Sequence, residues 1–391
     1  MSDDAKPVEA KSVSGTYEAG LKGATETVAE FHEDTSALKT LQHWLHQTPS
    51  AVPLIVLIAA LLVFGFAADN FFKPGTLSTI LQQIAIVGIL GCAQTLVILT
   101  AGIDLSVGAI AVFSSVLMGQ ATFRYGLPAE LAIAIGLALG TAMGALNGFL
   151  IAKLKLPPFI VTLGTWQILL ASNFIFSANE TIRSSDISEQ APALQFWGGS
   201  IEPGGVKILY AVFLMIALVA IMAYVLRHTA WGRHVYATGD DPQAAELAGV
   251  PTQKVLIQVY ALAGFFCAIA GWVMIGRFGS VSPTASTGQL GNIQSITAVV
   301  IGGISLFGGR GSIVGMFFGA LIVGVFEMGL RLVGTDPQWT FFLIGVLIIF
   351  AVAVNSGSER CQADGTHSQG PHSSRSGPLQ ALRQGHRAEQ L

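Results

Sequence analysis

Charged residues are scarce in this sequence. They make up 11% of its 391 residues, against about 25% in an ordinary soluble domain, and the formal net charge is −3. Between positions 51 and 354 there are only 12 basic and 12 acidic side chains. So few charges do not cover the surface of a soluble domain of that size, and they argue against a nucleic-acid binder or a disordered chain. With 52% hydrophobic residues, the composition predicts a polytopic membrane protein.

Cysteine is also rare, and its positions exclude two further classes. Cys92 and Cys267 lie in apolar runs, whereas Cys361 lies in a polar tail. This spacing fits neither a disulfide framework nor a metal site, and we expect no metal and no cofactor. The acidic and polar segment 1–50 has no apolar stretch of the kind found in a cleavable signal peptide, so we expect it to remain as a tail.

Long apolar runs fill the middle of the chain. A helix needs about 20 apolar residues to cross the hydrocarbon of a bilayer. We count ten such runs, of which the third, eighth and tenth are short enough to be re-entrant or broken helices, and we predict an all-α bundle of about ten transmembrane spans within residues 51–354. The runs are Ala51–Ala68, Ile80–Thr100, Val107–Phe123, Ala129–Ala152, Phe159–Ala178, Val206–Leu226, Val255–Ile275, Ile293–Phe307, Ile313–Val333 and Trp339–Val354.

Glycine is abundant where cysteine and charge are not. The chain has 45 glycines, and several recur four residues apart, as in Gly136, Gly140 and Gly144. That spacing places them on one face of a helix, where they let a neighbouring helix approach closely. We interpret these repeats mainly as helix-packing surfaces.

One polar segment between the sixth and seventh runs has the marks of a short, capped helix. Asp241 is a suitable N-cap, Pro242 suits the first helical position, and Gly249 ends the helix. A helix of about seven residues does not persist alone in water. It is ordered either by docking on a partner or by packing on its own bundle, and the residues alone leave both readings open.

A second motif interrupts the apolar sequence between the second and third runs. In Leu99–Gly108, Asp104 and Ser106 stand between two apolar stretches. A carboxylate is costly there and is usually functional, which favours a broken helix lining a path. The alternative is an interfacial turn in which Asp104 caps the third helix.

A glycine-rich motif, Val300–Ser312, faintly echoes the second one. Gly-Gly-Ile-Ser-Leu, with Ser305, corresponds to Ala-Gly-Ile-Asp-Leu. Matching interruptions hint at an internal repeat, for which five plus five spans would fit. The motif lacks the Lys-Ser/Thr ending of a phosphate loop, and that loop pattern occurs nowhere in the chain.

These motifs together resemble the membrane permeases of bacterial ribose/xylose/fructose-type ABC sugar importers, most closely fructose permeases. The resemblance runs from about Val52 to Val354. Its motifs are Ala101–Gly108, Asn147-Gly148 with Lys155–Thr165, Gly239–Val250 and Gly302–Ser312.

The resemblance implies a transport subunit that is not itself an enzyme. It implies a separate cytoplasmic ATP-binding subunit, a periplasmic sugar-binding protein and a second permease copy in the bacterial inner membrane. The ATPase-coupling helix of the family maps onto Asp240, Asp241, Pro242, Ala244, Ala245, Leu247 and Gly249. That loop is then cytoplasmic and so are both termini, whereas the distribution of Lys and Arg alone is close to a tie.

A neutral sugar needs hydrogen-bond partners in the membrane rather than charges. The polar candidates along the path are Asp104, Ser106, Gln94, Asn147, Asn173, Asn292 and Ser305. Each of the amides is equally suited to holding helices together. The polar tail 355–391 departs from the family pattern, and we expect it to be disordered.

Two other functions stay open at this point. An ion-coupled secondary sugar carrier predicts uptake that follows an ion gradient without a partner ATPase. The near absence of His, Asp, Glu and Lys within the apolar runs argues against it. A membrane scaffold or enzyme predicts a chemical site, and no nucleophile–base pair or metal cluster in the sequence supports one.

Overall fold

The computed structural model describes residues 51–283 and 285–336, together with isolated positions between 338 and 349. In this part of the chain the apolar runs are helices α3 to α7, α9 and α12 to α14. Their bounds are α3 Ala51–Ala67, α4 Pro74–Leu99, α5 Val107–Phe123, α6 Ala129–Leu154, α7 Pro158–Ser177, α9 Tyr210–His228, α12 Thr252–Phe278, α13 Ala285–Ile301 and α14 Ile313–Leu332.

Six of these helices are long and apolar enough to cross a membrane: α4, α6, α7, α9, α12 and α14. Shorter apolar helices are present at 51–67, 107–123 and 290–301, where the first, third and eighth spans were predicted. The all-α bundle is therefore confirmed. The count of ten spans stays a prediction, because the tenth run falls largely outside the described residues. The two predicted tails, 1–50 and 355–391, lie wholly outside them. The internal repeat stays a prediction as well.

The eighth helix lies earlier in the chain than the hydropathy pattern predicts. The helix α13 begins at Ala285 and ends at Ile301, whereas the hydropathy pattern placed it at Ile293–Phe307. The first half of α13 carries polar residues that lower its hydropathy, and one of them, Asn292, is buried against protein. Residues 302–312 are instead a loop, because several of its glycines have positive φ.

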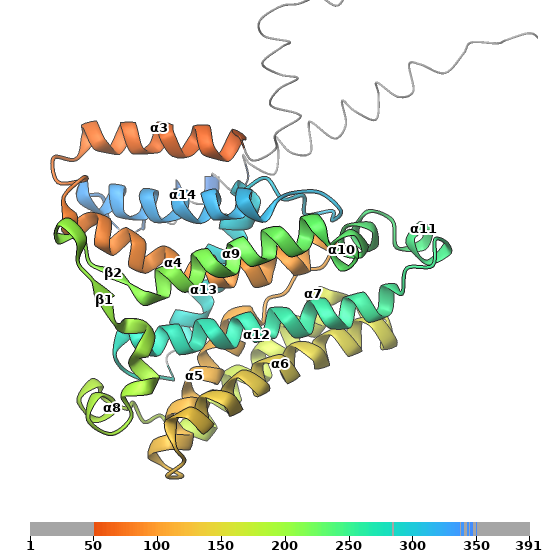
Figure 1. Ribbon diagram of the computed structural model, residues 1–391, viewed down its shortest axis with the longest axis horizontal. Helices are drawn as coiled ribbons and strands as arrows, with labels where there is room; N and C mark the ends of the chain where they lie inside the picture. Colours follow the sequence, from red (N-terminus) through yellow and green to blue (C-terminus); the bar gives the residue numbers. More distant parts are fainter. Residues whose placement is uncertain are drawn as a thin grey trace, which may run out of the picture. The chain divides into compact units, whose positions relative to one another are not determined.

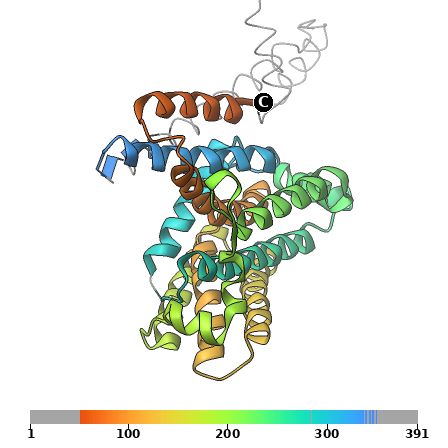
Figure 2. The ribbon, with the colours of Figure 1, turned by 60° about the vertical axis from the view of Figure 1, so that its left-hand side comes forward.

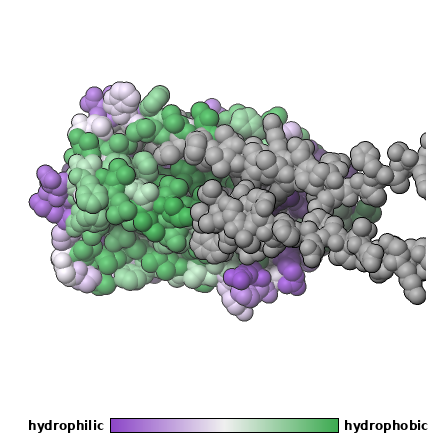
Figure 3. Space-filling view, turned by 90° about the horizontal axis from the view of Figure 1, so that it is seen from above, coloured by the Kyte–Doolittle hydropathy of each residue, from purple (hydrophilic) through white to green (hydrophobic). Residues whose placement is uncertain are grey.

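Helices α4 and α12 form the centre of the bundle. About 89% of the apolar stretch of α4 and 72% of that of α12 is buried inside the protein, against about one third for α6, α7 and α9. In both ribbon views α3 and α14 lie on one side of this centre, and α5 and α6 lie on the other (Figures 1 and 2). The outer helices present apolar side chains outward, and Figure 3 shows a largely hydrophobic face, as a lipid-facing surface requires.

The two ends of the bundle carry polar segments of different kinds. At one end lie α8 (Ser184–Gln190), the 3-10 helices η1 (Pro192–Gly198) and η2 (Pro203–Gly205), and a two-stranded hairpin. In the hairpin β1 (Ser200–Ile201) pairs antiparallel with β2 (Ile208–Leu209). At the other end lie α10 (Ala230–Asp240) and α11 (Pro242–Leu247), as Figure 1 shows.

Glycines set the contact between α6 and α12. A Cβ on Gly264 would lie 2.1 Å from the carbonyl oxygen of Gly140, and one on Gly144 would lie 2.1 Å from that of Tyr260. Real side chains never approach a backbone oxygen so closely, so only glycine permits this crossing. The prediction that Gly140 and Gly144 form a helix-packing surface is confirmed.

We predict that Gly144→Leu forces α6 and α12 apart and lowers the free energy of unfolding by at least about 1–3 kcal/mol, the usual cost of overpacking. The measurement is the thermal unfolding midpoint of the purified protein in detergent. Gly164→Leu on α7 is the matched control, because Gly164 is exposed and no atom lies within 4 Å of its added Cβ. Equal midpoints for the two variants would contradict the prediction.

Candidate functional site

The short helix α11 is built as its sequence predicts. The Asp241 side chain accepts hydrogen bonds from the backbone N–H of Gln243 at 2.9 Å and of Ala244 at 3.0 Å, and Pro242 is the first helical residue. Gly249 follows the helix with φ +85°, a left-handed conformation that glycine adopts without strain. The Thr252 hydroxyl donates to the Glu246 carboxylate at 2.5 Å and ties α11 to α12.

The side chains of α11 divide into a face toward the protein and a face toward solvent. Ala245 is 5% exposed and packs on its own chain, whereas Leu247 is 91% exposed. Asp240, Asp241, Pro242, Ala244 and Gly249 are exposed as well. A leucine that projects from a polar loop end is an apolar group without a partner in the described part of the chain.

Helix α10, which its sequence pattern does not distinguish from the adjoining loop, connects α11 to the bundle. The Thr229 hydroxyl caps it by accepting from the N–H of Gly232 at 3.1 Å. The Tyr236 hydroxyl donates to the carbonyl oxygen of Gly311 at 2.9 Å. Burial raises the pKa of Tyr236, which further favours the protonated hydroxyl that makes this bond.

Both interrupted motifs meet at one backbone contact, which we call the glycine junction and define by Leu99, Gly239, Gly308 and Gly309. The N–H of Gly309 donates to the carbonyl oxygen of Leu99 at 2.9 Å. A Cβ on Gly239 of α10 would lie 1.8 Å from that same oxygen, and one on Gly308 would lie 2.6 Å from the carbonyl oxygen of Gly239. The junction therefore joins the end of α4, the glycine-rich loop and α10.

Asp104 starts a buried chain of hydrogen bonds. It is 2% exposed, and its Oδ1 accepts from the Ser106 N–H at 2.7 Å and from the Ser106 hydroxyl at 2.6 Å. The Asn147 amide donates to Ser106 Oγ at 3.0 Å, and the Thr165 hydroxyl donates to Asn147 Oδ1 at 2.6 Å. The chain links the interrupted segment to α6 and α7.

Asn292 on α13 holds the same interrupted segment from the other half of the sequence, through backbone groups of that segment. Its Oδ1 accepts from the N–H of Gly108 at 2.5 Å, and its amide nitrogen donates to the carbonyl oxygen of Leu105. Asn292 thus satisfies backbone groups that the break before α5 leaves without helical partners. The residue at the N-cap of α5 is Ser106 rather than Asp104, so the alternative of Asp104 as the cap of that helix is wrong.

The predicted polar residues fall into several groups. Asp104, Ser106 and Asn147 belong to one network, and Asn292 bonds backbone groups of the same interrupted segment. Ser305 lies in the glycine-rich loop, where its hydroxyl accepts from the Phe307 N–H at 3.3 Å. Gln94 is fully buried on α4, and neither of its amide atoms has a hydrogen-bond partner among the described residues. Asn173 on α7 donates to the carbonyl oxygen of Pro283 at 2.8 Å.

A separate polar cluster surrounds Glu327 on α14. Arg331 pairs with Glu327 Oε1 at 3.3 Å, as the spacing of four residues predicts. The amides of Gln83 on α4 and Gln294 on α13 both donate to Glu327 Oε2. The two glutamines were missed because a lone glutamine in an apolar run carries no signal of its partner.

Comparison with known proteins agrees with this architecture. Residues 76–352 match the family described as branched-chain amino acid transport system / permease component. The chain is 61% identical to a fructose import permease of Rhizobium meliloti over 344 residues, which cover 88% of this chain and 95% of the relative.

Two further relatives are named for other sugars. The ribose import permease of Escherichia coli K12 is 36% identical over 80% of this chain and 94% of its own length. The galactose/methyl galactoside import permease of the same strain is 33% identical over 77% and 92%. These relatives are transport components rather than enzymes. The chain therefore belongs to the branched-chain amino acid transport system / permease component family of multi-pass membrane proteins.

Proposed function

We propose that the chain is the permease subunit of an ABC importer that carries a monosaccharide across the bacterial inner membrane. Fructose is the proposed sugar, because a fructose import permease is 61% identical over most of the chain, with ribose and mannose as further candidates. A separate cytoplasmic ATPase drives transport, and a periplasmic binding protein delivers the sugar. Two permease copies form the path, and both termini are cytoplasmic.

The observation that carries the link to an ATPase is the exposed apolar side chain of Leu247 on a capped six-residue helix. Burying a leucine on a partner contributes about 1.5–3 kcal/mol. Ala244 and Gly249 complete the outward face, while Ala245 anchors the helix to its own chain. Because the capped helix is fixed before docking, little conformational entropy is lost when it enters a groove on the ATPase.

The glycine junction connects the docking helix, through α10, to the rest of the bundle. When the ATPase pair closes on ATP, α11 and α10 move together, and Gly239 lies against the carbonyl oxygen of Leu99. A displacement of α10 therefore changes the position of both interrupted segments. The Asp104 network lies a few residues beyond Leu99 and ties that displacement to α6, α7 and α13.

An ion-coupled secondary carrier is the second candidate, favoured by the buried carboxylate of Asp104 and the half-buried carboxylate of Glu327. Uptake of labelled fructose into vesicles that contain the chain with its ATPase and binding protein decides between the two. Uptake that requires ATP supports the importer. Uptake that follows an imposed ion gradient and ignores ATP would replace it with the carrier.

We predict that Leu247→Asp weakens ATPase docking about 10- to 100-fold and abolishes ATP-dependent uptake, because the lost apolar contact is worth about 1.5–3 kcal/mol. The measurements are co-purification of the ATPase and uptake of labelled fructose. Leu156→Asp is the matched control, since Leu156 is also an exposed leucine, in the loop between α6 and α7. That loop lies at the same end of the bundle, where Lys153 bonds Gln253 at 2.8 Å. Similar uptake by both variants would contradict the assignment of α11 as the helix that docks on the ATPase.

We predict that Gly239→Ala separates ATP hydrolysis from transport. The added methyl would lie 1.8 Å from the Leu99 carbonyl oxygen and must push α10 away from the junction. We expect uptake to fall about tenfold or more while the assembled complex still hydrolyses ATP. Gly164→Ala, a helical glycine with open space, is the control. Wild-type uptake by Gly239→Ala would refute the proposed route.

We predict that Cys361 reacts with a membrane-impermeant maleimide in inverted vesicles but not in intact spheroplasts, because the C-terminal tail is proposed to be cytoplasmic. The other two cysteines, Cys92 and Cys267, are buried and add little background. Labelling is read by a mass shift of the purified chain, with Cys361→Ser as control. Labelling of spheroplasts at the rate seen in inverted vesicles would reverse the proposed orientation.

A further inference from the structure

The hydroxyl of Tyr260 is a buried polar group without a partner in the described part of the chain. Tyr260 lies on α12, one of the two central helices, and is 1% exposed. Its hydroxyl makes no hydrogen bond to any described residue. A buried hydroxyl left in this way costs free energy that a phenylalanine at the same position would not cost. Packing in the arrangement seen here therefore gives no reason for a tyrosine rather than a phenylalanine.

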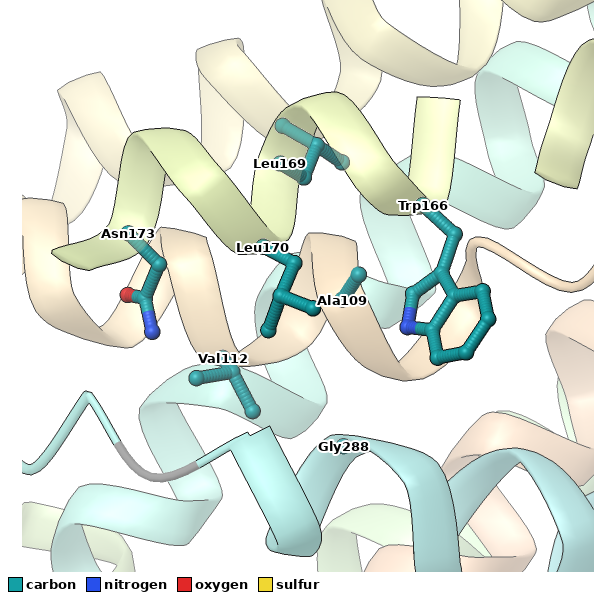
Figure 4. A pocket seen from close by; sticks show the side chains of 7 residues that line it. All are labelled: Ala109, Val112, Trp166, Leu169, Leu170, Asn173 and Gly288. Atoms are coloured by element: carbon teal, nitrogen blue, oxygen red, sulfur yellow. The ribbon is translucent and has the colours of Figure 1, made fainter. Parts of the chain in front are cut away.

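A bound water molecule is the simplest partner for a buried hydroxyl, and the structure has a cavity of that size in another place. Figure 4 shows this cavity between α5, α7 and α13, with Val112, Leu170 and Gly288 among its lining residues. Its volume of about 10 Å³ has room for about one water molecule. Tyr260 does not line the cavity, so a water molecule in it does not reach the Tyr260 hydroxyl.

An unused acceptor lies on the segment that the Tyr260 hydroxyl touches. A Cβ on Gly102 would lie 2.6 Å from that hydroxyl, and Asp104 follows two residues later. Both hydrogen bonds that Asp104 receives come from Ser106 and go to Oδ1, and Oδ2 receives none from the described residues. The Asp104 charge acts electrostatically on Tyr260. A donor and an acceptor are therefore neighbours that are not bonded to each other in this arrangement.

Of these two groups, Tyr260 is the one that backbone packing holds in place. A Cβ on Gly144 of α6 would lie 2.1 Å from the Tyr260 carbonyl oxygen, and one on Gly148 would lie 3.0 Å from the Tyr260 Cβ. Asp104 instead lies five residues after Leu99, whose carbonyl oxygen belongs to the glycine junction. A displacement of α10 at that junction therefore moves the segment that carries Asp104 relative to the fixed hydroxyl.

We propose that Tyr260 is a positioning residue of the transport cycle, whose hydroxyl donates a hydrogen bond to Asp104 Oδ2 when the closed ATPase pair has displaced α10. The inference rests on the proposed function and names a contact that distinguishes the second arrangement of the bundle from the one seen here. A hydrogen bond to a carboxylate is about twice as strong as one between neutral groups. Because this bond forms in one arrangement only, it shifts the balance between the two.

The first test is uptake of labelled fructose by the reconstituted full transporter with Tyr260→Phe, which loses only the hydroxyl. We expect the maximal rate to fall about tenfold, the effect of one hydrogen bond to a charged group. The concentration of loaded binding protein that gives half of this rate should stay within about twofold, because that docking step does not involve Tyr260. Tyr125→Phe is the matched control, since Tyr125 is 59% exposed in the loop between α5 and α6. Equal maximal rates for the two variants would refute the proposal.

The thermal unfolding midpoint of the assembled transporter distinguishes a positioning role from a structural one. Without nucleotide, Tyr260→Phe should unfold at or above the wild-type midpoint, since it removes a buried hydroxyl that has no partner. In the complex trapped with ATP and vanadate, it should unfold below the wild-type midpoint, because the bond to Asp104 is missing. A midpoint below wild type without nucleotide would show that the hydroxyl already has a partner, such as a bound water molecule, and would overturn the proposal.

Asp104→Asn identifies the acceptor. The asparagine keeps one oxygen for Ser106 but places a nitrogen where Oδ2 was, and that nitrogen cannot accept a hydrogen bond. Asp104→Asn, Tyr260→Phe and the double variant should therefore share one reduced uptake rate. Reductions that multiply in the double variant would show independent roles and exclude Asp104 as the partner.

Two kinds of failure remain distinct. If Asp104→Asn does not assemble, the midpoints of Tyr260→Phe with and without trapped nucleotide decide, and a change of the same sign in both states would reject the positioning role. Wild-type vesicles without any ATP-dependent uptake would instead refute the proposed function, on which the inference rests.

Discussion

The structure depends on a constraint that the bilayer imposes on backbone polar groups. Where a helix is broken within a membrane bundle, its free N–H and C=O groups must find partners in the protein. The break after α4 and the glycine-rich loop before α14 meet this requirement through each other, because the N–H of Gly309 bonds the carbonyl oxygen of Leu99. Asn292 and Tyr236 satisfy further groups on either side. Two segments some 200 residues apart are thereby held as one unit.

Glycine makes that solution sterically possible. At the junction the backbones of α10 and the two loops approach so closely that a methyl group on Gly239 would overlap the Leu99 oxygen. The absence of side chains also lets α6 pack closely against α12 at Gly140, Gly144 and Gly264. In lipid, where apolar side chains gain little by leaving the solvent, close backbone packing of this kind replaces the hydrophobic effect as the source of helix association.

The apolar surroundings of the bundle also determine how its buried polar groups are used. Hydrogen bonds between side chains, as in the Asp104 network, hold helices of the bundle in place. A permease must keep its helices paired while they move. At the surface, the side chain of Leu247 is an exposed apolar group that can be buried by a partner.

The sequence by itself determined the membrane class, the approximate bounds of the helices, the cap of α11 and the family, because hydropathy, capping and motif spacing are local properties. It misplaced α13, since polar residues that face protein look like a loop in a hydropathy profile. Only the tertiary structure decided that Asn147 and Asn292 both hold the interrupted segment after α4, and that Ala245 turns inward while Leu247 turns outward. These facts depend on which helix faces meet, and helix faces of nearly uniform hydrophobicity carry no pattern that selects a neighbour.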